Sequence, residues 1–398
     1  MSLKLSKKEF ALLDQVTNSL WSFLMMRILY SESDSRQIAL LGMTLIFAYS
    51  CSGFLRSKFV HPLYGGFGIE YQFEKFDALP ILKRLLPRYF SVFVTVFVIF
   101  LELNSTRSIR FLFELIILMS SIVLLDFLRS FLQLNCDFFF GVFANFLGIV
   151  VFFSLIKLET NNSFNLNTLS PIDFWIISNL VVSLLILVFL KILTIVSTSL
   201  ISPSKDLASN FEKISSLSII EFIQGRFFNL VGSALLLQIS EQTAANFTLA
   251  LFIYSTLPFS VINGLSPYYL RNRKVAEGNL PLGKYFGYIC VAALIMPMIT
   301  VISPIALDTI FGSVQQTQPG LIFFVILMVA QKSHESALSL DSMIRMSAVR
   351  YSSAKVIITL SVYVVAPISL GFGNTSLGLL ILIVVIIAQI ILLRKSEK

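Results

Sequence analysis

Long runs of apolar residues follow one another along this chain and are separated by short polar gaps. A helix needs roughly 20 apolar residues to cross the hydrocarbon core of a bilayer. We expect about twelve spanning helices, at residues 9–29, 38–58, 89–104, 109–128, 139–157, 173–196, 217–238, 246–267, 285–303, 320–340, 353–371 and 376–393. The widest gaps are residues 59–88 and 158–172, so the pattern predicts an all-α polytopic membrane protein with no sizeable soluble domain.

The composition supports the same class. Of the 398 residues, 56% are hydrophobic and only 13% are charged, a balance that excludes an ordinary soluble globular protein. The three cysteines are isolated in sequence and form no CxxC motif, so we expect neither disulfides nor a metal site. No cofactor is expected.

The positions of lysine and arginine predict the orientation. Cytoplasmic segments of membrane proteins carry an excess of these residues. If both termini lie inside, 22 of the 30 fall in cytoplasmic segments, and Arg129 is counted among them. The formal net charge of +8 then reflects topology, and no nucleic-acid partner is expected.

The two halves of the chain share weak internal similarity. The first run contains NSLWSFLMMRI from Asn18, and the seventh contains NLVGSALLLQI from Asn229, an offset of 211 residues. Arg129 and Arg345 align at an offset of 216. Similar offsets in the same order favour two six-helix lobes, residues 1–202 and 203–398, related by an axis along the membrane normal.

With this duplication, the segments ALLDQVTNSLWSFLMMRIL and LLDFLRSFLQ resemble the Wzx-type lipid-linked oligosaccharide flippases. These belong to the multidrug/oligosaccharidyl-lipid/polysaccharide (MOP) exporter superfamily, which also includes the MATE drug antiporters. The resemblance implies alternating-access transport of a polyprenyl-diphosphate-linked oligosaccharide across the bacterial inner membrane, in polysaccharide biosynthesis. It implies no enzymatic activity.

Arg226 is the main candidate for binding substrate. It lies about ten residues into the seventh run, and a charge at such depth is costly unless it faces protein or water. Asn229 and Ser233 share its helical face, where a guanidinium and two polar groups suit a phosphate and sugar hydroxyls. A structural ion pair with Glu335 or Glu114 and snorkelling stay open as alternatives. The further cavity candidates are Asn18, Lys332 and Arg27.

Acidic and titratable residues within the runs are candidates for coupling and gating. Glu335 and His334 lie on a polar stripe of the tenth run and suggest proton coupling, although a structural helix end is as good an interpretation. Asp14 is either a cytoplasmic gate or a solvated helix start. Glu221 and Glu114 complete this set, and protons and sodium are the candidate coupling ions.

Two other classes compete with the flippase. A MATE-like cation or drug antiporter predicts that acids dominate the cavity, whereas Arg226 and Lys332 favour an anion. A membrane-embedded glycan-modifying enzyme needs a large external loop, and the external segments are short.

Overall fold

The computed structural model describes residues 7–32, 34–56, 60, 86–103, 109–134, 138–160, 170–196, 228–271, 291, 295, 320–331 and 357–396. Within these ranges the chain is helical apart from short turns, and none of the described residues lies in a β-strand. The predicted all-α class is therefore confirmed for this part of the chain.

The helices match the predicted apolar runs closely. They are α1 (Lys7–Glu32), α2 (Ser35–Leu55), α5 (Leu86–Leu103), α6 (Ile109–Leu134), α7 (Phe138–Thr160), α8 (Pro171–Val196), α10 (Phe228–Ile239), α11 (Glu241–Arg271), the π-helix η4 (Ser361–Val365), α17 (Ala366–Gly371) and α18 (Thr375–Ser396). Residues 320–331 form a further helix. The predicted run at 285–303 lies outside the described residues, apart from two helical positions.

Polar caps mark several helix boundaries. Before α8, the Ser170 hydroxyl accepts from the Asp173 backbone N–H at 3.3 Å while the Asp173 carboxylate accepts from the Ser170 N–H at 2.8 Å, a reciprocal capping box. Asn374 caps α18 by accepting from the Leu377 N–H at 3.0 Å. Gly373 ends the preceding helix with φ of 74°, a conformation that glycine adopts without a steric penalty.

The chain divides into two compact units. Unit 1 comprises Met1–Met25, Phe47–Ser218 and Gly264–Gly278; unit 2 comprises Met26–Ile46, Ile219–Asn263 and Asn279–Lys398. Helices α1 and α2 each contribute residues to both units. The division into lobes 1–202 and 203–398, the total of twelve spans and the orientation stay predictions.

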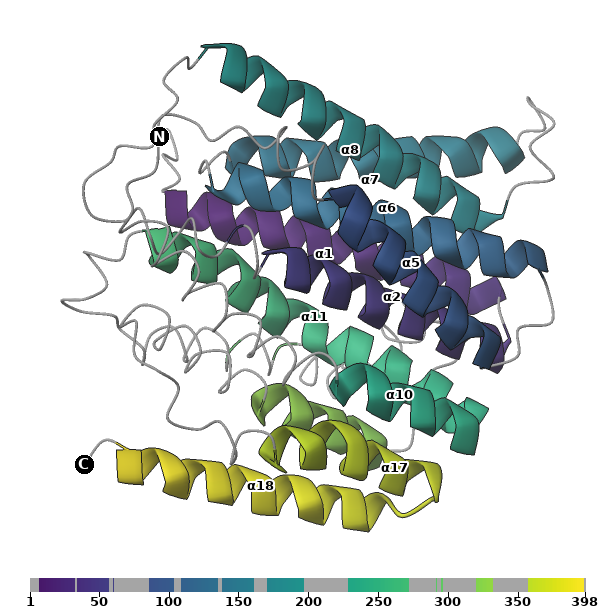
Figure 1. Cartoon of the computed structure of the whole chain (residues 1–398), viewed down its shortest axis with the longest axis vertical. Coiled ribbons are helices and arrows are strands. Elements are labelled where there is room, and N and C mark those ends of the chain that lie inside the picture. Colours follow the sequence, from purple (N-terminus) through teal and green to yellow (C-terminus); the bar gives the residue numbers. More distant parts are fainter. Residues whose placement is uncertain are drawn as a thin grey trace. The chain divides into compact units, whose positions relative to one another are not determined.

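In unit 1, the helices α6, α7 and α8 pack side by side, and α5 packs against α6 (Figure 1). Phenylalanine fills much of this core: the Phe140 and Phe189 rings of α7 and α8 stack with centroids 3.7 Å apart. Phe127 and Phe131 meet edge to face on α6. The first contact joins α7 to α8, and the second lies within α6.

In unit 2, α10 packs against η4 and α17, and α17 against α18. A glycine allows the closest of these approaches, since a Cβ on Gly232 would collide with the backbone carbonyl of Tyr363 in η4. The π-helical turn lies just before Pro367, a residue that lacks a backbone N–H.

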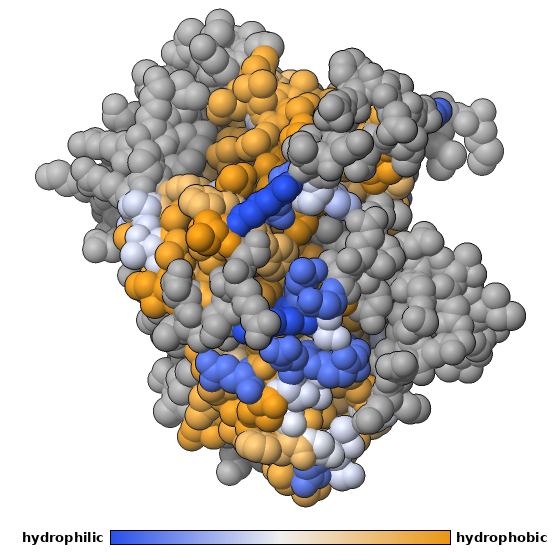
Figure 2. Space-filling view, turned by 90° about the vertical axis from the view of Figure 1, so that its right-hand side faces the viewer, coloured by the Kyte–Doolittle hydropathy of each residue, from blue (hydrophilic) through white to orange (hydrophobic). Residues whose placement is uncertain are grey.

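Stripes of exposed apolar side chains run along several helices. On α7 the stripe recurs every three to four residues, which places it on one helical face: Phe139, Phe143, Phe146, Val150 and Phe153. Apolar residues, orange in Figure 2, cover much of the described surface in that view. Four of the described helices are long and apolar enough to cross a bilayer: Ser35–Leu55, Ile109–Gln133, Phe138–Leu158 and Pro171–Leu190. The protein is therefore a multi-pass membrane protein.

Candidate functional site

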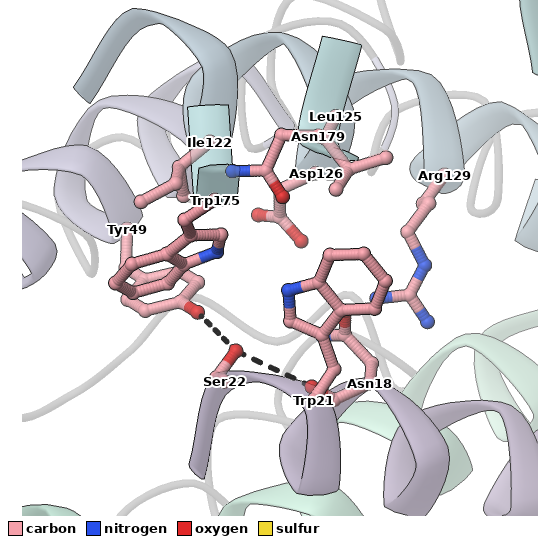
Figure 3. Close-up of a pocket in the computed structure, with 10 residues that line it drawn as sticks. All are labelled: Asn18, Trp21, Ser22, Tyr49, Ile122, Leu125, Asp126, Arg129, Trp175 and Asn179. Carbon is pink, nitrogen blue, oxygen red and sulfur yellow. Dashed lines mark hydrogen bonds between the residues drawn. The ribbon is translucent and has the colours of Figure 1, made fainter. Parts of the chain in front are cut away.

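A polar pocket lies within unit 1, between helices α1, α2, α6 and α8 (Figure 3). The space in it that admits the centre of a water molecule is about 20 Å³, and one buried water needs roughly 10–15 Å³. Its lining combines aromatic, amide, hydroxyl and charged side chains: Asn18, Trp21, Ser22, Tyr49, Ile122, Leu125, Asp126, Arg129, Trp175 and Asn179. In a bundle this apolar, so many polar groups at one place are the strongest candidate for function.

A buried ion pair borders the pocket. Arg129 Nη2 of α6 donates to Asp14 Oδ1 of α1 at 2.8 Å, and both side chains are at most 3% exposed. Asn145 Nδ2 of α7 donates to the same oxygen at 3.2 Å. Asp14 Oδ2 accepts from Gln15 Nε2 at 3.2 Å and Gln133 Nε2 at 3.4 Å. With this many donors around it, the carboxylate is compensated despite its burial.

Two glycines of α7 let this helix approach α1 closely. A Cβ on Gly141 would collide with the Asp14 carboxylate, and a Cβ on Gly148 would collide with the Trp21 ring. Both positions therefore depend on glycine's missing side chain. The close approach brings Asn145, which lies between the two glycines, within hydrogen-bonding distance of Asp14.

A second ion pair lies at the α2 side of the pocket. Arg56 Nη2 lies 3.3 Å from Asp126 Oδ2, and the two side chains are 17% and 16% exposed. The Ser52 hydroxyl donates to the same oxygen at 2.5 Å. Each of the two acids at the site is thus paired with one arginine, and the four charges balance.

Neutral polar groups complete the pocket. The hydroxyls of Ser22 and Tyr49 are 3.1 Å apart, and Asn179 Nδ2 donates to Ser121 Oγ at 3.1 Å. Trp21 differs from these residues, because its Nε1 is buried and has no hydrogen-bond partner among the described residues. In Figure 3 the indole nitrogens of Trp21 and Trp175 both face the space below the Asp126 carboxylate.

The predicted site residues of α1 and α6 have different surroundings. Asn18 lines the pocket. Asp14 is 2% exposed, so its interpretation as a solvated helix start is wrong, while its gating role stays a prediction. Glu114 accepts from Arg110 Nε one turn earlier on α6 at 2.9 Å, and its coupling role is likewise untested. The Arg27 side chain lies outside the described residues, although its backbone belongs to α1.

Two predicted cavity residues lie in α10 of unit 2. Asn229 is half-buried, and Ser233 is buried with a hydroxyl that has no hydrogen-bond partner in the described part of the chain. The other predictions for the second half fall outside the described residues: Glu221, Arg226, Lys332, His334 and Glu335.

Several residues of the pocket were not predicted from the sequence. Arg129 was expected in a cytoplasmic segment after a span ending at 128, whereas α6 continues to Leu134 and buries this arginine. Asp126 lies three residues before Arg129, a spacing that places both on one helical face and was a usable signal. No comparable signal marked Trp21, Trp175 and Asn179, because aromatic and amide side chains are common in spanning helices. Among the described residues no cluster of histidine, cysteine and acidic side chains is suited to hold a metal.

Neither a protein-family model nor the sequence of a curated protein matches this chain. Solved structures do match it. A MATE in complex with MaL6 has a TM-score of 0.53 and 12% identity, with 100% of this chain and 98% of that one covered. A MATE in complex with Br-NRF has a TM-score of 0.52 and 13% identity, with 98% of this chain and 95% of that one covered.

A third structure is an outward-facing multidrug resistance MATE family transporter of the MOP superfamily, with a TM-score of 0.51, 12% identity and coverage of 99% and 98%. At such low identity the likeness establishes the fold alone. The chain has the fold of these MATE transporters over its whole length. The likeness is one of fold, and the resemblance to the MOP superfamily and, more narrowly, to the oligosaccharide flippases stays a prediction.

Proposed function

We propose that this protein is an alternating-access transporter that moves a polyprenyl-diphosphate-linked oligosaccharide across the bacterial inner membrane. The observation that carries the proposal is a polar, charge-balanced pocket inside an apolar bundle whose fold, end to end, is that of known transporters. Polar side chains at membrane depth are retained where they face protein or a water-filled path. A glycan head group needs such a path, while its lipid tail stays in the bilayer.

The head group has two chemical parts that need different partners. Its diphosphate is anionic and suits Arg226 and Lys332, and Asn229, Ser233 and Arg27 are the further residues proposed to bind it. Its sugar units are rich in hydroxyls and suit amide, indole and hydroxyl side chains, the groups that line the pocket of unit 1. Glu335, His334, Asp14, Glu221 and Glu114 are proposed to couple transport to protons or sodium or to gate the path.

A MATE-like drug or cation antiporter is the second candidate, because the similar solved structures are described as MATE transporters. An organic cation requires an acid that is free to neutralise it. In the pocket of unit 1, however, Asp14 is paired with Arg129 and Asp126 with Arg56. This pairing favours an uncharged group at the pocket over a cationic drug.

Transport in proteoliposomes tests the proposal. We expect translocation of a fluorescent polyprenyl-diphosphate oligosaccharide, abolished in Arg226→Ala and poorly restored in Arg226→Lys, because lysine lacks the forked donor geometry. Lys157→Ala is a matched control, since it removes one positive charge at an exposed position. Transport of a cationic dye without transport of the lipid would instead establish the antiporter.

A further inference from the structure

The pocket of unit 1 has a hydrogen-bond donor that no described residue uses. Trp21 is 4% exposed, and its Nε1 donor has no partner among the described residues. Leaving a buried donor unpaired costs about 1–3 kcal/mol. The indole nitrogen faces the same space as the Asp126 carboxylate (Figure 3). A ligand at this place would therefore find a donor and an acceptor facing the same point.

The charges at the pocket argue against an ion as that ligand. Asp14 and Arg129 neutralise one another at 2.8 Å, and Asp126 and Arg56 at 3.3 Å. Of these four residues only Asp126 and Arg129 line the pocket, so a bound cation would face the Arg129 guanidinium and the positive edge of an indole, whereas a bound anion would face the Asp126 carboxylate. A neutral group that both accepts and donates a hydrogen bond meets neither repulsion. The hydroxyl is the simplest such group.

The size and the lining residues of the pocket further limit which ligands fit. The space of about 20 Å³ that admits the centre of a water molecule is enough for one hydroxyl-sized group. Trp175 and Tyr49 provide apolar ring surface beside polar atoms, and Asn179 provides an amide. Such a mixture of aromatic and hydrogen-bonding side chains suits a molecule that has C–H faces and hydroxyl edges.

We propose that this pocket binds the hydroxyl edge of a neutral sugar unit of the transported glycan, with Trp21 Nε1 donating to the hydroxyl oxygen and Asp126 accepting its proton in a hydrogen bond. This inference rests on the proposed function and deepens it, because it divides the head group between two places. The sugar is recognised in unit 1, and the diphosphate is bound elsewhere.

The chain provides its own reporter for this site. It has two tryptophans, Trp21 and Trp175, and both line the pocket. Intrinsic tryptophan fluorescence of the purified full-length protein in detergent therefore reports on this pocket with no background from elsewhere. We would titrate glucose, galactose, mannose and N-acetylglucosamine, and separately sodium chloride, potassium chloride and inorganic phosphate at constant ionic strength.

We expect a saturable change in fluorescence with at least one neutral sugar and none with the salts or phosphate. In Trp21→Phe the ring remains but the N–H is lost, and Trp175 remains as reporter; the sugar should bind about three- to ten-fold more weakly. Ser183→Ala is the matched control. It removes a buried hydroxyl that has no partner among the described residues and that lies on α8 outside the pocket lining, so sugar affinity should stay unchanged.

Three results would overturn the inference: a response to sodium or potassium alone, a response to phosphate alone, or no response to any sugar by protein that elutes as a single folded species. The binding assay requires no transport, so its outcome is separate from that of the proposed function. Lipid transport without sugar binding would refute this site and leave the flippase standing. Sugar binding without lipid transport would support the site and refute the proposed cargo.

Discussion

Two ion pairs join helices that are far apart in the chain, and their surroundings are opposite. Arg129 and Asp14 connect α6 to α1 at 2.8 Å, with side chains 3% and 2% exposed. Arg36 and Glu241 connect the starts of α2 and α11 in unit 2 at 3.1 Å, with side chains 35% and 49% exposed. An arginine–carboxylate pair is therefore buried in a packed core in the first case and exposed at a surface in the second.

The difference lies in what each charge faces when its partner is absent. An exposed charge regains water, so such pairs are worth about 0–1 kcal/mol and are weakened by salt. A buried charge has no solvent to return to, and removing one partner costs about 3–5 kcal/mol. The buried pair therefore determines how α1, α6 and α7 fit together, whereas the exposed pair adds little to stability.

The largest expected effect follows from Arg129→Met, which leaves the Asp14 carboxylate buried without its cation. We expect a loss of about 3–5 kcal/mol, seen as a large fall in the thermal unfolding temperature in detergent and in the yield of monodisperse protein. Replacing both partners, Asp14→Leu with Arg129→Met, should recover much of this loss because no uncompensated charge remains.

Arg110→Met is the matched control, since Arg110 has a 64% exposed side chain on the same helix. Equal stability of Arg129→Met and Arg110→Met would show that the buried pair contributes no more to stability than the exposed Arg110 does. An unrecovered double variant would show that the hydrogen bonds from Asn145 and Gln133, and not the charge, dominate at Asp14.

Unit 2 has a close contact of another kind, and Gly232→Ala tests it. The added Cβ would meet the backbone carbonyl of Tyr363, which cannot rotate away as a side chain can. We expect a destabilisation of about 1–3 kcal/mol, measured by thermal unfolding. Gly320→Ala is the control, because the new Cβ would lie 3.7 Å from Thr375 and alanine favours helix. A neutral effect of Gly232→Ala would mean that α10 and η4 pack more loosely than the structure shows.

Helix α6 also shows how far the sequence predicts this fold. Apolar runs located the helices within a few residues, because spanning helices must be apolar along most of their length. The predicted fourth span ended at residue 128 and left Arg129 in a cytoplasmic segment. The helix continues to Leu134 because tertiary partners compensate the charges of Asp126 and Arg129.

The pocket itself was less predictable. Periodicity places Asp14 and Asn18 on one face of a helix, and Asn18 does line the pocket. It does not reveal that Asp14 meets a residue 115 positions away, nor that Asn145 joins them. Such partners depend on how helices pack, and the glycines that permit the close approach of α7 look like ordinary glycines of a spanning helix.

The smallest expected effect on stability is at the exposed pair, and its dependence on salt should distinguish it from the buried pair. Arg36→Ala should change stability by less than about 1 kcal/mol. A double-mutant cycle with Glu241→Ala isolates the coupling between the two side chains, and we expect that coupling to shrink as salt is raised. The coupling between Asp14 and Arg129, measured in the same way, should change little with salt because ions do not reach it. Equal salt sensitivity of the two couplings would mean that solvent reaches Asp14 as freely as Glu241, and that burial does not distinguish the two pairs.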